Sequence, residues 1–135
     1  MTLTYAAEAN ATPDVVWELL ARPARWREWA PHVRGAWGLG QPEVEAGRSG
    51  LIRLAPALLV PVRVTGKRAG RSWDWKIGPV AIRHRLEPRR ERCVVAVDLD
   101  APAPIARLLA VSYGPLVAVL VRNLARVAAG GSGAV

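Results

Sequence analysis

The sequence predicts an α+β fold in which a curved antiparallel sheet wraps around one long C-terminal helix. Two observations carry this prediction. The middle of the chain alternates apolar and polar residues in one segment after another, and the last third places apolar residues at helical spacing. The expected order is one strand, two short helices, six strands and one long helix. The strands are expected at residues 2–9, 33–39, 48–55, 58–66, 71–78, 80–87 and 92–99.

The N-terminal segment predicts a strand followed by two short helices. Residues 2–9 alternate between two faces, as in a half-buried strand. Thr12 before Pro13 marks a helix start, because threonine can cap free backbone N–H groups and a proline in the first turn leaves no N–H unpaired. Pro23 ends this helix, and a second short helix through 26–29 ends before the next proline.

The alternation is regular enough to assign the faces of three strands. Trp73 and Trp75 share the apolar side of 71–78, and His84 lies among the apolar residues of 80–87. A sheet with one apolar face needs an element that covers it. The other inward residues expected in these strands are Ile77, Val80, Ile82, Leu86, Cys93, Val95, Val97 and Leu99.

The segment 104–128 is expected to supply that cover. Leu116, Leu120 and Leu124 recur at helical spacing. Gly114 and Pro115 interrupt the segment, and we expect a break or kink there, because proline lacks a backbone donor and clashes with the preceding turn. Residues 1–129 are therefore expected to form one domain, and the glycine-rich residues 130–135 a flexible tail.

Composition restricts the class of protein. A chain of 135 residues with 51% apolar and 22% charged residues has the size and composition of one globular domain. The lone Cys93 excludes an internal disulfide, and two histidines are too few for a zinc site without carboxylates. We therefore expect no metal and no cofactor. The N-terminus lacks the charged start and continuous apolar run of a signal peptide, and we expect a cytoplasmic protein.

A net charge of +8 would suit an anionic partner, but the basic residues are spread along the chain. The densest group, within 83–92, is interrupted by Glu87 and Glu91 and lacks the signatures of RNA-binding and zinc-finger sequences. We interpret it as a solvated outer sheet face and expect no specific nucleic-acid partner. The apolar run 104–121 contains Arg107 and the glycine–proline break, which argues against a membrane span. Monomer and homodimer both remain open.

A family resemblance is carried by ATPDVVWELL at 11–20, followed by Trp26, Trp29 and Pro31. These residues resemble the opening of the START-like or SRPBCC superfamily, in particular its bacterial polyketide cyclase/dehydrase branch. Over about residues 3–128 the resemblance implies the helix-grip fold, also found in Bet v 1-like proteins. Arg22, where an acidic residue is common, and the break at Gly114 depart from the pattern. Gly50, Trp73, Trp75, His84 and Pro88 stand where such proteins often have Gly, Trp, His and Pro.

Two side chains could carry chemistry in an internal cavity. His84, the one imidazole expected on the inner face, could transfer a proton, orient a polar ligand group, or pack in the core beside a hydrogen-bonding neighbour. Tyr113 could present its hydroxyl to the cavity or serve in capping or at an interface. Cys93 is expected to be a buried, inert thiol and His32 an exposed side chain. The ligand-binding residues expected are Trp37, Val62, Trp73, Trp75, Ile82, His84, Val95, Val97, Tyr113, Leu116, Leu120 and Asn123.

Members of this superfamily bind lipids, polyketides or hormones, and some catalyse reactions, so three functions fit the sequence. We favour the binding of a hydrophobic small molecule, lipid- or polyketide-like, by a carrier or sensor. The alternative is a cyclase-, aromatase- or dehydratase-type enzyme in which His84 and Tyr113 transfer protons. A third function is that of an interaction protein whose own side chains fill the cavity. The volume of the cavity, and whether two titratable groups converge inside it, discriminate among the three.

Overall fold

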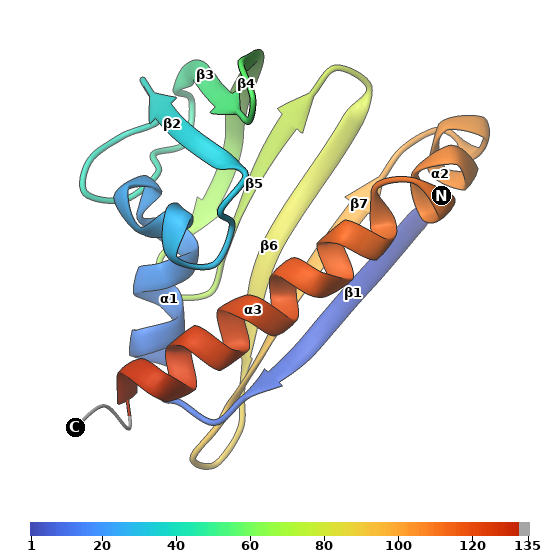
Figure 1. The fold of residues 1–135 in the computed structure, drawn as a ribbon. Coiled ribbons are helices and arrows are strands. Elements are labelled where there is room, and N and C mark those ends of the chain that lie inside the picture. The colour runs from blue at the N-terminus through green and yellow to red at the C-terminus, as the bar shows by residue number, and fades with distance from the viewer. Residues whose placement is uncertain (133–135) are drawn as a thin grey trace.

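A seven-stranded antiparallel sheet curves around a C-terminal helix in the computed structural model (Figure 1). The structure describes residues 1–132, with side chains up to residue 130. The spatial order of the strands is β1-β7-β6-β5-β4-β3-β2, so the predicted helix-grip architecture is confirmed. The elements are β1 (Thr2–Ala9), α1 (Pro13–Ala21), the 3-10 helix η1 (Pro23–Glu28), β2 (Val33–Trp37), β3 (Ser49–Leu54), β4 (Leu58–Arg68), β5 (Ser72–Ile77), β6 (Val80–Pro88), β7 (Cys93–Asp100), α2 (Ala103–Val111) and α3 (Gly114–Ser132).

The first and the last strand pair at one edge of the sheet. β1 pairs with β7 from Thr2 opposite Asp100 to Ala9 opposite Cys93, whereas β2 to β7 follow one another as antiparallel neighbours. α3 crosses the concave face and packs against β1 and β7, and α1 packs against α3, β6 and β7 (Figure 1). The hydrophobic core therefore lies between the concave side of the sheet and these two helices.

Tryptophan side chains satisfy the free carbonyl groups at the end of α1. The last turn of a helix leaves backbone carbonyls without intrahelical donors. The indole of Trp29 donates to the carbonyl of Leu19 at 2.8 Å, and the indoles of Trp26 and Trp73 both donate to the carbonyl of Leu20, at 2.9 and 3.1 Å. These bonds join α1, η1 and β5, which fixes the positions of three indole rings beside the cavity described below.

The C-terminal helical segment is broken, as predicted, and forms two helices. α2 and α3 are bent by 62° relative to each other. Gly114 begins α3 where the hydroxyl of Tyr5 from β1 occupies the space that a β-carbon would need. Of the described helices, none is long and apolar enough to cross a membrane alone, whereas α2 and α3 together have that length and composition despite their bend.

The end of α3 differs from the expected tail. The helix continues to Ser132, so residues 130–132 are helical. Residues 133–135 of the expected tail lie outside the described part of the chain.

Arginines of β6 lie on the outer face of the sheet and pair with carboxylates of β5 and β7. Arg83 contacts Asp74 at 3.1 Å and Arg85 contacts Asp98 at 2.8 Å. Although burial raises it, hydrogen bonds from Arg85 and Thr4 hold the pKa of Asp98 below its ordinary value. The Arg83–Asp74 pair is solvent-exposed, and such pairs contribute about 0–1 kcal/mol, whereas the Arg85–Asp98 pair is partly buried. This cluster thus fits the interpretation as a solvated, internally paired sheet face.

Candidate functional site: a cavity between the sheet and the C-terminal helix

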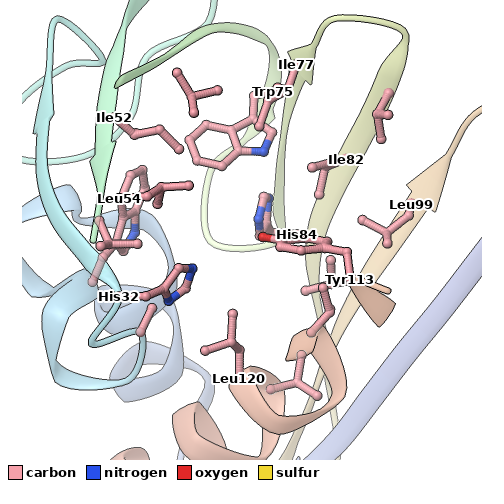
Figure 2. Close-up of a pocket in the computed structure, with 18 of the residues that line it drawn as sticks. His32, Ile52, Leu54, Trp75, Ile77, Ile82, His84, Leu99, Tyr113 and Leu120 are labelled. Atoms are coloured by element: carbon pink, nitrogen blue, oxygen red, sulfur yellow. The ribbon is translucent and has the colours of Figure 1, made fainter. Parts of the chain in front are cut away.

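An apolar cavity of about 280 Å³ lies between the concave face of the sheet and the helices (Figure 2). Aliphatic and aromatic side chains make up most of its wall, and none of the described side chains in the wall belongs to Asp, Glu, Lys or Arg. The residues that line it are Trp26, Trp29, Ala30, His32, Val33, Ile52, Leu54, Val60, Trp73, Trp75, Ile77, Val80, Ile82, His84, Val97, Leu99, Leu109, Tyr113, Val117, Leu120 and Val121.

The closed end of the cavity is a stack of flat rings. Trp73 lies between Trp26 and His84, nearly parallel to both, with ring centroids 5.6 and 3.9 Å away. Trp75 meets Trp73 and His84 edge to face, at 5.0 and 5.5 Å. Trp73 and His84 are opposite each other in the register of β5 and β6, so the pleat of the sheet places both rings on the inner side. The stack is a rigid aromatic floor.

Two polar atoms in this floor have no partner. Among the described residues, no group hydrogen bonds to the indole Nε1 of Trp75 or to Nδ1 of His84, and both atoms are buried. Leaving a buried polar atom unpaired costs about 1–3 kcal/mol. The other indoles of the cavity wall do not share this cost, since Trp26, Trp29 and Trp73 donate to carbonyls of α1. The unsatisfied pair therefore needs an explanation.

Burial keeps the titratable groups of the cavity neutral. Desolvation lowers the pKa of His84 to about 3, against weaker opposing effects of the neighbouring Trp73 backbone and of the charge of Asp98. Burial also raises the pKa of Tyr113. At neutral pH the imidazole is therefore uncharged and the phenol protonated. Figure 2 shows the ring of Tyr113 reaching from the helical side toward His84.

His32 is placed differently from the sequence-based expectation. It was expected to be exposed, but it is half-buried and contributes to the cavity wall, where burial lowers its pKa. The reason is the path of the chain from η1 into β2: Ala30, His32 and Val33 all line the cavity. Local sequence could not show this, because a histidine in a proline-containing turn ordinarily points to solvent.

The structure brings together many of the residues predicted to bind a ligand. Seven side chains lie in the wall: Trp73, Trp75, Ile82, His84, Val97, Tyr113 and Leu120. Trp37 lies outside it and is 51% exposed. A bulge between Val33 and Gly35 reverses the alternation of β2, so that Ala36 faces Ile52 on the inner side and Trp37 pairs with Leu51 on the outer side.

Four further predicted residues do not reach the cavity. Val62 and Val95 are buried in the packed core, since the cavity occupies only part of the concave face. Leu116 is partly exposed because the buried stripe of α3 is centred on Val117, Leu120, Val121 and Leu124. The amide of Asn123 donates to the carbonyl of Trp29 and accepts from Arg126, so its partners are protein groups.

Several lining residues were missed from the sequence. Trp26 lies in η1 and Trp29 directly follows it, and the docking of η1 onto the sheet is a tertiary event. Ile52, Leu54 and Val60 come from the strands at 48–55 and 58–66, where the period-2 pattern, although visible, did not reveal which face is inward. Val117 and Val121 lie one position beyond Leu116 and Leu120 on α3, so a small rotation of the helix decides between them.

Metal and thiol chemistry find no support in the part of the chain that the structure describes. No group of three or more His, Cys, Asp or Glu side chains is arranged to hold a metal ion. Cys93 is buried, and burial raises the pKa of its thiol. A protonated, buried thiol is a poor nucleophile, as the sequence predicted for this residue.

The sheet, the helix in its concave face and the cavity between them define a START-like protein of the helix-grip class. The chain belongs to the family described as polyketide cyclase/dehydrase and lipid transport, whose model matches residues 1–129. No curated protein matches the sequence.

Solved structures share the fold at low sequence identity. A START superfamily protein from Mycobacterium smegmatis is 14% identical, with a TM-score of 0.72 over 94% of this chain and 96% of that one. The protein Ara h 8.0201 is 10% identical, with a TM-score of 0.65 over 95% and 97% of the two chains. DynU16, from the dynemicin biosynthetic locus, is 21% identical with a TM-score of 0.70, and the match covers 97% of this chain but 48% of that one.

Proposed function

We propose that this domain is a cytoplasmic carrier or sensor that binds an uncharged, mainly apolar small molecule through one polar group. The observation that carries the proposal is the unpaired indole N–H of Trp75 next to the unpaired Nδ1 of His84 in a mainly apolar wall. Ligand pockets characteristically combine apolar surface with a few well-placed polar groups. A lone cysteine suits a reducing compartment, which supports the cytoplasmic location.

The volume of the cavity restricts the ligand to a small one. At about 280 Å³ the cavity is near the lower end of the range for ligand pockets, roughly 300–1,000 Å³. An apolar cavity of roughly 150 Å³ holds one benzene molecule. The volume therefore fits a compound of roughly two fused rings, or the end of a longer chain whose remainder leaves through the mouth. It is also too large for the interpretation in which the protein's own side chains fill the cavity.

The electrostatics of the wall favour a neutral polar group, and a hydroxyl matches best. The indole N–H of Trp75 is a donor, whereas Nδ1 of His84 accepts or donates according to its tautomer. A hydroxyl can accept from the first and complement the second in either tautomer. A carboxylate would be desolvated in this wall, because burial lowers the pKa of both its imidazoles, His84 and His32, and the wall contains no Lys or Arg side chain.

The test compares naphthalene with 2-naphthol by isothermal titration calorimetry. The two compounds have the same ring system, and 2-naphthol adds a hydroxyl. We expect 2-naphthol to bind about two- to tenfold more tightly, the range that one net hydrogen bond gives. Trp75→Phe and His84→Phe should reduce that preference while leaving the affinity for naphthalene nearly unchanged. Equal affinities in the wild type would refute the polar anchor, and absence of binding by both compounds would refute the cavity function.

A pair of substitutions on α3 checks that the probes bind in this cavity. Leu120 lines the cavity, whereas Leu116, one turn earlier on the same helix, lies outside the wall and is partly exposed. Leu120→Trp should therefore abolish binding of both naphthalene compounds by filling the space, and Leu116→Trp should leave it intact. If both substitutions, or neither, abolished binding while the proteins stayed folded, the site would be elsewhere.

The enzyme alternative has one observation in its favour: His84 and Tyr113 line the same cavity. Its weakness is the low pKa of His84, which makes the buried imidazole a weak base. For any substrate that the domain is found to turn over, proton transfer by this pair predicts that His84→Phe and Tyr113→Phe each lower kcat by about 10²–10⁴-fold. Unchanged turnover in both variants would exclude that role.

A further inference from the structure

The cavity has a mouth, and its position follows from the burial of the lining residues. The side chains of the ring stack are buried, whereas lining residues from three other places keep partial exposure. One place is the β3–β4 hairpin with the start of β2 beside it, the second is the β5–β6 turn, and the third is α2 with the residues after it. The partly exposed lining residues there are Leu54, Val60, His32 and Val33, then Ile77 and Val80, then Leu109 and Tyr113. Figure 1 shows these three segments at one end of the molecule, opposite the β6–β7 turn. The mouth therefore opens at that end.

Large apolar side chains stand exposed on both sides of this mouth without lining the cavity. Leu58 and Leu59 in the β3–β4 hairpin are 58% and 55% exposed, and Leu108 and Val111 in α2 are 65% and 77% exposed. None of the four belongs to the cavity wall. Exposed apolar groups gathered around an entrance mark an interaction surface rather than isolated surface leucines. We call these four residues the apolar rim.

The charges around the apolar rim are predominantly positive. Asp100, at the end of β7 opposite Ala81, is paired with the N-terminal amino group at 3.6 Å. The sequence has no Asp or Glu within 46–73, 75–86 or 101–132, the stretches that contain the β3–β4 hairpin, the β5–β6 turn and α2. Arg53, Lys76 and Arg107 are exposed there, and none of them forms an ion pair among the described residues. At the opposite end of the sheet, by contrast, Arg92 pairs with Glu8 at 2.6 Å. The unpaired cations thus share one end of the molecule with the apolar rim.

We propose that the mouth docks on an anionic lipid bilayer, with the apolar rim entering the interface and Arg53, Lys76 and Arg107 facing lipid headgroups. Each cation near such a surface and each buried aliphatic side chain adds to the binding. A second copy of the chain is a poorer occupant, because two positively charged rims would repel each other. The inference rests on the proposed function: a sparingly soluble ligand could then pass between bilayer and cavity without crossing water.

Co-sedimentation with vesicles tests the docking. We expect the protein to bind equimolar phosphatidylcholine–phosphatidylglycerol vesicles, to bind pure phosphatidylcholine far less, and to be released by salt. Leu58→Ser with Leu59→Ser, and Leu108→Ser, should each weaken binding, and Arg107→Glu should weaken it roughly tenfold or more. Arg90→Glu in the β6–β7 turn changes net charge equally at the far end and should have a much smaller effect.

Three results would overturn the proposal: no binding to anionic vesicles, equal loss in Arg107→Glu and Arg90→Glu, or a homodimer in sedimentation velocity that the rim substitutions dissociate. The last result would assign the face to a second copy. Binding of 2-naphthol separates this proposal from the function on which it rests. Rim variants that no longer bind vesicles but still bind 2-naphthol would support both the docking and the cavity function. If the wild-type protein binds 2-naphthol but not anionic vesicles, the docking alone is refuted. If it binds vesicles but neither naphthalene compound, the cavity function alone is refuted.

Discussion

Acid should destabilise this protein through His84 before it acts on most carboxylates. In the unfolded chain the imidazole takes up a proton below its ordinary pKa of 6.5, whereas in the folded protein it does so only near 3. Between these values the unfolded state binds more protons, so the free energy of unfolding falls as the pH falls. At about 1.36 kcal/mol per pH unit, the whole window corresponds to about 5 kcal/mol. This is comparable with the total stability of a small domain, about 5–15 kcal/mol.

The assay is urea denaturation followed by tryptophan fluorescence at a series of pH values. Between pH 6.5 and 5, His84 alone should remove about 2 kcal/mol. His32 contributes in the same direction, because burial lowers its pKa as well, so the measurement is made in a His32→Gln background. Glu28 and Asp98, whose pKa values also lie below their ordinary ones, add their loss at lower pH, below about 4.5.

Replacing His84 by Phe isolates its contribution. Phenylalanine keeps a flat ring against Trp73 and removes the unpaired Nδ1, so the stability at neutral pH should stay within about 1 kcal/mol of the parent. The slope of stability against pH between 6.5 and 5 should then largely disappear. A slope unchanged by His84→Phe would refute the reasoning, as would an imidazole NMR signal of His84 that titrates near 6.5 in the folded protein.

Three further predictions concern packing. Trp29→Phe should cost about 1–3 kcal/mol in urea denaturation, because it leaves the carbonyl of Leu19 without its donor; a cost near zero would contradict this. Gly114→Ala should destabilise the fold by about 1–3 kcal/mol through overlap with the Tyr5 hydroxyl, and adding Tyr5→Phe should recover much of the loss, which a double-mutant cycle measures. Cys93 should react with a thiol reagent only after urea unfolds the protein, and rapid labelling of the native state would count against its burial.

The sequence could predict the elements because local patterns produce them. Each strand segment shows its own alternation, and the structure places β1 at Thr2–Ala9, as expected, and the others within about two residues of their predicted ends. The inward positions of Trp73, Trp75 and His84 follow from the same alternation, since their strands are regular. The break at Gly114 could also be predicted from neighbouring residues, because a proline follows it. The fold class and a part of the cavity wall could therefore be predicted from the sequence.

What the chain by itself determined is the succession of strands and helices and the apolar face of each regular strand, because both depend on neighbouring residues. The tertiary structure decided the rest. A bulge in β2 turned Trp37 outward, the docking of η1 brought Trp26 and His32 to the cavity, and the rotation of α3 selected Val117 over Leu116. The unpaired nitrogens of Trp75 and His84 also emerge only in three dimensions, because whether a buried polar atom finds a partner depends on residues that the fold, not the sequence neighbourhood, brings to it.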